Sequence, residues 1–438
     1  MPAFKEFSNI SSNYHSRSNA GKAGGLLFFL LLILMPVSTT VFPYIHGLVI
    51  AVAVMGSVIF HYMFGNRNSI EKDEKTFFIS IIISLGVILV VSLFSVMGSE
   101  GQGQLVKFLL LIMIFPVYFF FRRYQFDYAA LWYGLVAGAF ISVIVGLYEI
   151  IFEVYKPGYP GRAKGATHPI IFGNLALLMG VMSMAGLGWF RARAKWQVIL
   201  PVLALSSGLL ASVLSQARGG WVAIPVFVLI FFWVSRAYFS VLKQLLSFIA
   251  LMVFISLIYF IPQTGMQSKV EHTVESVQKY LDVDSPEKFE FSSIGSRFEM
   301  WKASWIIFKK NPVLGVGWGK YQEQAKKLVE NGEISAIAVE HIHPHNQFLS
   351  VMVSGGILAL IAFLILIYVP AKIFVDVIRF KSRSVDAQRV ALAGLIFLVG
   401  FVVFNFSESL FERSRSVSFF IFYLAVCMVG IRDYKELR

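Results

Sequence analysis

The sequence predicts an all-α polytopic membrane protein with about twelve transmembrane helices, on two features of composition and one of patterning. Hydrophobic residues make up 57% of the 438 residues and charged residues only 14%. A soluble domain has about 45–50% apolar and about 25% charged residues. Apolar stretches of roughly 20 residues also recur, the length a helix needs to cross about 30 Å of hydrocarbon.

Twelve apolar stretches account for most of the chain, and we expect them to form a single integral membrane domain over residues 1–438. They cover residues 24–43, 45–64, 77–97, 105–121, 131–153, 169–190, 197–214, 221–235, 246–262, 346–368, 390–410 and 417–431. The first is too long for a signal-peptide core and no small-residue cleavage site is evident, so we expect it to be retained. A large polar loop, residues 263–345, separates the ninth and tenth stretches.

The basic residues predict the orientation. They concentrate in alternate polar segments: residues 1–23, 65–76, 122–123, 191–195, 236–243, 370–389 and 432–438. Because short cytoplasmic loops carry the excess of Lys and Arg, both termini are expected in the cytoplasm and the 263–345 loop outside. The net charge of +13 therefore offers no case for a nucleic-acid partner.

A few basic residues lie on the opposite side, against this rule. They include Lys156, Arg162 and Lys164 in one short loop, Arg218 in the SQARGGW segment, and Lys107 just inside the fourth stretch. One interpretation is that they reach membrane lipid phosphates. The other is that they converge on an anionic ligand, because a cation at the membrane edge is costly and guanidinium groups fit phosphate or pyrophosphate well.

The 263–345 loop carries patterns typical of helices. Residues 266–281 and 296–310 have helical spacing, and the second segment places Trp301, Trp305 and Phe308 on one face. We expect Ser296 to cap that helix and Arg297 to lie in its first turn, where it can meet an anion at the helix end. The glycines of NPVLGVGWGKY resemble a loose phosphate loop, but their spacing fits neither a dinucleotide fingerprint nor a P-loop.

Three histidines close the loop: His341, His343 and His345. On an extended chain they would face one way, as metal ligands do, but Glu340 is the only carboxylate with suitable spacing. Hydrogen bonds to backbone are a second interpretation for His341 and His343. His345, at the entrance of the next span, suits a general base because an imidazole can take a hydroxyl proton near neutral pH.

The single cysteine, Cys427, excludes an intrachain disulfide and a cysteine-based metal site. Paired carboxylates of the glycoside-hydrolase type are not apparent in the loop.

Three stretches together resemble the O-antigen ligase and polymerase superfamily, over roughly residues 165–360. HNQFLSVMVSGGIL is similar to its His–Asn–nine residues–Gly motif, here His345, Asn346 and Gly356, with Ala359 where the family often has Gly, Thr or Tyr. SIGSRFEMWKASWIIFKKNPVLGVGWGKY resembles a second block, and SQARGGW the upstream arginine motif.

The resemblance implies a metal-independent, membrane-embedded glycosyltransferase of the GT-C kind that uses no cofactor. The donor would be an undecaprenyl-pyrophosphate-linked glycan and the acceptor lipid A–core, at the periplasmic face of a Gram-negative inner membrane. It implies that His345 is catalytic and that Arg218 and Arg297 bind the pyrophosphate. Charge placement adds Lys107, Arg162 and Lys164 to the pyrophosphate ligands, and Asn346 and His343 are expected to support the site.

Three other functions remain open. A polymerase that joins glycan repeats would share the donor and the motifs. A protein-glycosylating relative is disfavoured because we see no substantial extra domain after the last span. A transporter or flippase, a different functional class, would show charged or proline-broken helices at the bilayer midplane in two similar halves, and neither feature is clear.

Overall fold

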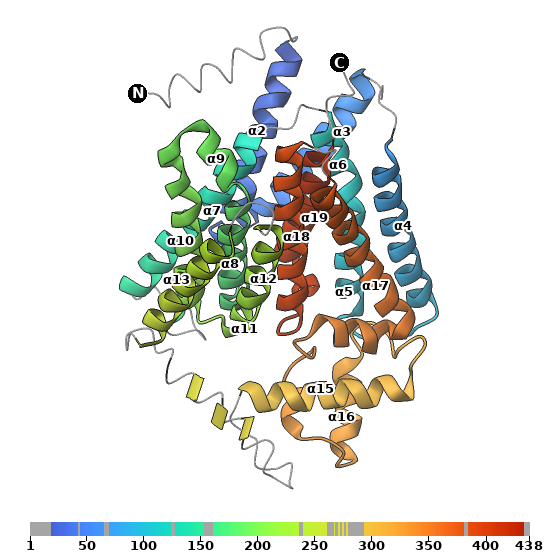
Figure 1. Cartoon of the computed structure of the whole chain (residues 1–438). Coiled ribbons are helices and arrows are strands. Elements are labelled where there is room, and N and C mark those ends of the chain that lie inside the picture. The colour runs from blue at the N-terminus through green and yellow to red at the C-terminus, as the bar shows by residue number, and fades with distance from the viewer. Residues whose placement is uncertain are drawn as a thin grey trace.

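The computed structural model describes residues 19–42, 44–64, 70–123, 128–152, 161–235, 240–260, 293–380 and 384–432, with single positions between 267 and 278. The described residues are overwhelmingly helical and contain no strand, which confirms the predicted all-α fold (Figure 1). Lys156 and most of the predicted 266–281 helix lie outside the described residues.

The described elements are α-helices and short 3-10 helices. The first half contains α2 (Asn19–Thr40), α3 (Ile45–Phe64), α4 (Lys72–Leu93), α5 (Gly101–Leu109), η1 (Leu110–Met113), α6 (Ile114–Arg122), α7 (Tyr128–Ile151), α8 (Pro169–Ala185), α9 (Leu187–Arg193), η2 (Lys195–Val198) and α10 (Ile199–Ser215). The second half contains α11 (Arg218–Trp221), α12 (Ala223–Ser235), α13 (Val241–Phe260), α15 (Ser293–Lys310), α16 (Tyr321–Glu330), η5 (Ala336–Val339), α17 (Gln347–Arg379), α18 (Val385–Asn405), η6 (Leu410–Glu412) and α19 (Ser414–Gly430).

The lengths and compositions of these helices are those of a multi-pass membrane protein. Among the described residues, six helices are long and apolar enough to cross a membrane, or seven if the bent α8–α9 pair counts as one span. Shorter apolar helices cover residues 26–40, 45–59, 218–234 and 414–430. The count of twelve spans and the outward placement of the loop remain predictions.

The helices form a bundle with α18 and α19 near its centre (Figure 1). α7, α8 and α10 pack together on one side, and α4 packs against α17 on the other. Much of the core is aromatic: Phe397, Phe401, Phe411, Phe420 and Tyr423 lie in ring contact around α18 and α19. Such pairs add to the stabilisation from burial, so the α18–α19 connection has a well-defined position.

A buried ionic cluster holds the end of the bundle at which α4 begins and α19 ends. Glu74 of α4 lies 2.9 Å from Arg122 Nε and 3.0 Å from Arg432 Nε, and Tyr118 donates a hydrogen bond to the same carboxylate. The Arg122, Arg432 and Glu74 side chains are nearly inaccessible to solvent. Removing one partner of such a cluster leaves a buried charge uncompensated, at about 3–5 kcal/mol. The cluster therefore fastens α4 and α6 to the end of α19.

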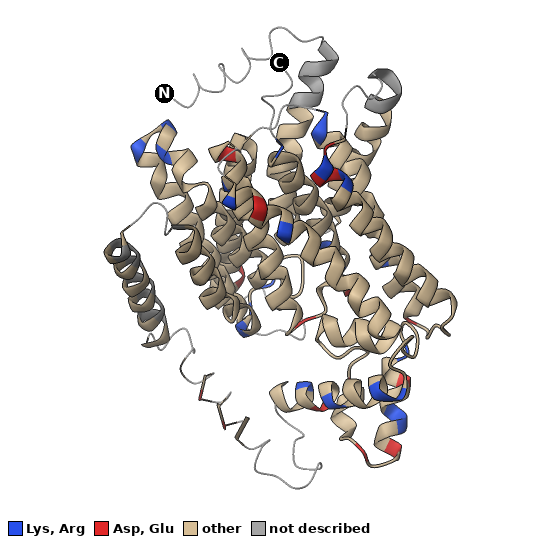
Figure 2. Ribbon diagram, turned by 45° about the vertical axis from the view of Figure 1, so that its right-hand side comes forward, with Lys and Arg blue, Asp and Glu red and all other residues tan. Residues whose placement is uncertain are grey.

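α15 and α16 form a layer across the other end of the bundle, which we call the loop end (Figure 1). Their own apolar cluster includes Met300, Ile307, Tyr321 and Leu328, and it continues onto Val353 of α17. Charged residues gather on this layer, whereas the long helices of the bundle are largely uncharged (Figure 2).

The predicted 296–310 helix is present as α15, with one correction at its start. α15 begins at Ser293, so Ser296 lies inside the helix and does not cap it. Arg297 consequently lies in the second turn and not the first. Arg297 is therefore not at the N-terminus of α15 and cannot bind an anion together with the helix end. It can contact an anion only where α15 packs on the bundle.

The glycine-rich turn after α15 packs closely on neighbouring backbone and does not resemble a phosphate-binding loop. Gly317 has φ 102°, and a Cβ at this position would collide with the Val96 carbonyl. The Gly317 amide donates to Ser354 O at 3.0 Å, so it is already used within the protein. In α17, Gly356 has φ 64° and marks a kink in the helix. A Cβ at this position would collide with the Val313 carbonyl. Only glycine tolerates these conformations and approaches at low cost.

Candidate active site

His345 lies at the entrance to α17, held in an uncommon backbone conformation. Its φ is 48°, and its amide N–H donates to His343 Nδ1 at 3.3 Å. The next residue, Asn346, caps α17: its side-chain oxygen accepts from the amides of Phe348 and Leu349 at 3.0 and 3.1 Å. A left-handed residue followed by a satisfied N-cap fixes the direction in which the imidazole leaves the chain. Asn346 thereby fixes the start of α17, and its support of the site stays a prediction.

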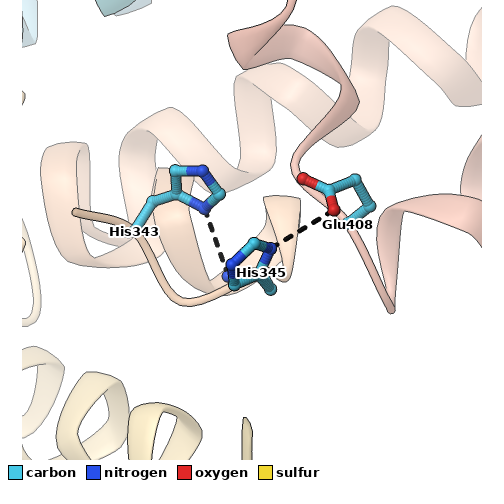
Figure 3. Close-up of side chains that lie close together, drawn as sticks. All are labelled: His343, His345 and Glu408. Atoms are coloured by element: carbon cyan, nitrogen blue, oxygen red, sulfur yellow. Dashed lines mark hydrogen bonds and ion pairs between the residues drawn. The ribbon is translucent and has the colours of Figure 1, made fainter. Parts of the chain in front are cut away.

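Glu408 contacts the His345 ring from the α18–α19 connector. Nδ1 of His345 lies 3.3 Å from Glu408 Oε2 (Figure 3). The carboxylate side chain is fully buried, whereas 16% of the His345 side chain is exposed. Burial by itself raises the pKa of Glu408, but the hydrogen bond and charge of His345, with the charges of His343 and Arg413, outweigh it and lower that pKa to about 2.

An ionised Glu408 determines which His345 nitrogen can act as a base. Because a carboxylate only accepts hydrogen bonds, the hydrogen of a neutral His345 is assigned to Nδ1, which faces Glu408. The lone pair is then on Nε2, on the side of the ring away from the carboxylate. This is the geometry of an oriented general base.

His343 is buried behind His345 and stays uncharged near neutral pH. Burial lowers its pKa to about 3. Since its Nδ1 accepts from the His345 amide, the hydrogen is on Nε2, which lies 3.8 Å from Glu412 Oε2. Burial raises the pKa of Glu412 to about 7. Ser350 and Gln104 donate to the Glu412 carboxyl at 2.6 and 3.3 Å.

The SQARGGW segment brings Arg218 beside the connector that bears Glu408. Arg218 opens α11, and the two glycines that follow it pack closely on neighbouring elements. A Cβ on Gly219 would collide with the Ser407 side chain, and one on Gly220 with the Asn174 side chain. The absence of side chains at both positions therefore allows Arg218 to lie next to the residue that precedes Glu408.

Arg297 reaches the same region from α15. Burial lowers its pKa, the nearby Glu408 carboxylate raises it, and the positive charge of Arg218 lowers it further. Arg297 is thus close enough to both residues for their charges to matter. Within the described part of the chain, its guanidinium group has no hydrogen bond or ion pair. Arg297 therefore lies within electrostatic reach of Arg218 and of the carboxylate that contacts His345. That these residues bind pyrophosphate and act as the base stays a prediction.

The other predicted cations lie around this centre in different places. Lys107 of α5 lies near Glu412, since its positive charge acts to lower the pKa of that carboxyl. Glu412 is in turn the neighbour of His343. Arg162 donates from Nε to Ser215 O at 3.1 Å and lies near His168. The Lys164 backbone amide donates to Glu149 at 2.7 Å. None of these contacts places Lys107, Arg162 or Lys164 directly against His345.

Sequence reasoning missed Glu408, Glu412, Arg413 and His168. His168 caps α8, with Nδ1 accepting from the Ile170 amide at 3.3 Å, and it lies within the electrostatic reach of Glu408, Arg413 and His345. Burial lowers the pKa of His168 to about 4. One signal was available: the connector SESLFERSRS places several charged residues between two apolar spans, where charge is expensive.

The same geometry supplies a possible set of metal ligands. One ligand atom from each of His343, His345 and Glu408 lies within 4.8 Å of the other two. Spacing along the sequence offered only Glu340 as a carboxylate, but Glu340 is exposed and the fold supplies Glu408 instead.

Part of the chain matches a known protein family. Residues 202–364 match the family model described as O-Antigen ligase. This match supports a relation of the chain to the O-antigen ligase family. Arg218, Arg297 and His345 lie inside the matched stretch, whereas Glu408 and Glu412 lie beyond its end.

A full-length likeness extends outside that domain. The chain is 22% identical, over 406 residues, to an uncharacterized protein of Haemophilus influenzae; the match covers 92% of this chain and 96% of that protein. The O-antigen ligase family consists of membrane glycosyltransferase-like proteins, so the match supports a transferase function in a bacterial membrane for this chain. The matched domain and the all-helical, apolar bundle point to the same conclusion.

Proposed function

We propose that this protein is an O-antigen ligase that transfers glycan from undecaprenyl pyrophosphate to lipid A–core. The observation that carries the proposal is the contact of His345 Nδ1 with the ionised Glu408, which leaves Nε2 as an acceptor. Arg297 is close enough to Glu408 and to Arg218 for their charges to shift its pKa. A base and two guanidinium groups are what glycosyl transfer from a pyrophosphate requires.

In the proposed reaction the acceptor hydroxyl gives its proton to His345 Nε2 as its oxygen attacks C1 of the donor sugar. The bond between C1 and the pyrophosphate oxygen breaks, and its electron pair leaves with the lipid pyrophosphate. Attack opposite the leaving group inverts the anomeric centre. Glu408 stabilises the imidazolium that forms, because an ionised carboxylate on Nδ1 favours the charged ring.

Arg218 and Arg297 stabilise the negative charge that grows on the leaving pyrophosphate. Preorganised donors in a partly dehydrated site contribute about 3–4 kcal/mol each in comparable anion sites. Lys107, Arg162 and Lys164 are proposed as further cations that attract and hold the donor. The reaction as proposed needs no metal and no cofactor, because the donor arrives activated and histidine supplies the base.

The proposed site faces the periplasm, with both chain termini in the cytoplasm. The arginines and His345 lie at the loop end of the bundle, and the positive-inside distribution of Lys and Arg favours placing this end outside. Membrane lipids and the two lipid-linked substrates are the expected partners.

Reconstitution tests the proposal. Proteoliposomes with the purified chain, undecaprenyl-pyrophosphate-linked glycan and lipid A–core should yield glycan-bearing lipid A–core, in EDTA as well as without it, and with an inverted linkage by NMR. His345→Ala should abolish the product while the protein stays monodisperse. Longer lipid-linked glycan without core attachment would identify a polymerase instead. Absence of any covalent product from the unmodified chain would favour a transporter.

A further inference from the structure

We infer that His343, His345 and Glu408 form an inhibitory binding site for Zn²⁺ beside the proposed base. Nothing in the ligase chemistry needs this ion. That binding inhibits transfer rests on the proposed role of His345, but the existence of the site does not.

The three side chains have the separations that a small tetrahedral ion requires. His345 Nδ1 and Glu408 Oε2 are 3.3 Å apart. Ligands that bind Zn²⁺ at about 2.0–2.1 Å in a tetrahedron lie about 3.3 Å from each other, by simple geometry. The third ligand atom is already within 4.8 Å of both (Figure 3). A small rotation of His343 would therefore complete three corners of the tetrahedron.

The hydrogen bonds that the ion would replace are long ones. The His345 amide lies 3.3 Å from His343 Nδ1, and the same distance separates His345 Nδ1 from Glu408. Both distances lie just beyond the usual 2.7–3.2 Å of N–H···O hydrogen bonds in proteins. The ion would replace them with bonds to two imidazoles and a carboxylate.

Glu412 is placed to hold the His343 ring from the side away from the ion. A metal on His343 Nδ1 leaves Nε2–H directed at Glu412, 3.8 Å away. Histidine ligands commonly donate their other N–H to a carboxylate, which orients the ring and raises its basicity. The charges that face the site are the carboxylates Glu408 and Glu412 and the cations Arg413, Arg297 and Lys107. The cations oppose the ion, so we expect a regulatory affinity and not a permanently filled site.

Occupation of the site disables the proposed base by a change of tautomer. When Zn²⁺ binds His345 Nδ1, the hydrogen of the neutral ring moves through solvent to Nε2, with no net change in protons. Nε2 then donates and cannot accept the proton of the acceptor hydroxyl. At the same time Glu408 binds the ion and no longer accepts a hydrogen bond from His345 Nδ1. Both effects stop transfer, and a chelator that removes the ion reverses them.

The binding test uses the purified full-length chain in detergent after treatment with EDTA and desalting. Titration with Co²⁺ should produce the visible d–d absorption of a four-coordinate site, without a thiolate band since Cys427 is buried in α19, and Zn²⁺ should abolish it. His343→Ala and Glu408→Gln should each weaken Zn²⁺ competition at least about tenfold. His341→Ala is the matched control, an imidazole of the same loop outside the ligand set, and should bind as the unmodified chain does.

The inhibition test uses the transfer assay with added Zn²⁺. Loss of transfer that EDTA reverses, at the concentrations that displace Co²⁺, supports the proposal. Unchanged binding in both His343→Ala and Glu408→Gln, or an equal loss in His341→Ala, overturns the ligand set. Transfer that persists with the site shown to be filled overturns the inhibition. Co²⁺ binding through the triad in a chain without transferase activity would keep the metal site and reject the proposed function.

Discussion

Nδ1 of His345 and Oε2 of Glu408 lie 3.3 Å apart, although 63 positions of sequence separate the two residues. One residue ends the polar loop before α17, and the other lies in the connector between α18 and α19. The contact joins the O-antigen ligase domain to a segment beyond its end. It also fixes the tautomer on which the proposed chemistry depends.

Glu408→Gln should lower the rate of glycan transfer with little effect on folding. The amide keeps the size of the side chain but can no longer stabilise an imidazolium, so we expect kcat to fall about 10²–10⁴-fold. Steady-state kinetics in proteoliposomes measure this. Glu340→Gln, which changes an exposed carboxyl beside the histidines, should have nearly unmodified activity. An active Glu408→Gln would show that the contact does not serve transfer.

Arg297→Ala should weaken use of the lipid pyrophosphate donor. A hydrogen bond to a charged group contributes about 1.5–3 kcal/mol, so we expect kcat/KM for the donor to fall roughly 10–100-fold. Arg297→Lys keeps the charge but not the bidentate geometry and should recover only part of the loss. Lys302→Ala, an exposed cation on the same helix, is the control, and a comparable loss there would argue against a specific role.

Gly219→Ala should reduce transfer by displacing Arg218. The new Cβ collides with the Ser407 side chain, so α11 must move away from the connector that bears Glu408. The double variant Gly219→Ala/Ser407→Gly removes the colliding atoms and should restore most of the activity. Gly103→Ala, where nothing lies within 4 Å of the new Cβ, should be neutral. No rescue in the double variant would contradict this account of the RGG sequence.

Glu412 should make the protein less stable as pH rises from about 4.5 to 7. Its pKa is raised from 4.5 to about 7 by burial, so the folded state holds a proton that the unfolded state releases in this interval. The stabilisation is complete below pH 4.5 and is lost through pH 7, up to about 3 kcal/mol. Thermal unfolding in detergent with EDTA should show Tm falling more steeply for the unmodified chain than for Glu412→Gln. Parallel Tm curves would show that Glu412 is not a titrating buried acid.

Glu408 should have the opposite effect in acid. Its pKa is lowered from 4.5 to about 2, so the ionised form stabilises the fold above pH 4.5. That contribution is lost as pH falls from 4.5 through 2. Between pH 5 and 3, the Tm of the unmodified chain should therefore decrease relative to that of Glu408→Gln. A constant Tm difference across this interval would remove Glu408 from the acid response.

The sequence identified Arg218 as a cation that positive-inside placement disfavours and His345 as an imidazole at the edge of an apolar span. Arg297 was identified by its place in a predicted helix and by the family resemblance. The roles of all three stay predictions. The sequence did not anticipate the start of α15 at Ser293, because helix ends depend on a few local contacts and are poorly fixed by periodicity. Glu408 was missed because it lies in a short connector, and no local sequence pattern indicates that this connector contacts the loop that ends at His345.

By itself, the sequence determined the environment and the chemistry: apolar stretches require helices in lipid, and only a few titratable side chains lie where a substrate could meet them. The tertiary structure decided which of these side chains meet. The kink at Gly356, the close packing at Gly219 and the aromatic core around α18 and α19 set the positions of three distant segments. Those positions bring Glu408 to His345, because closely packed helices fix the relative positions of residues that are far apart in the sequence.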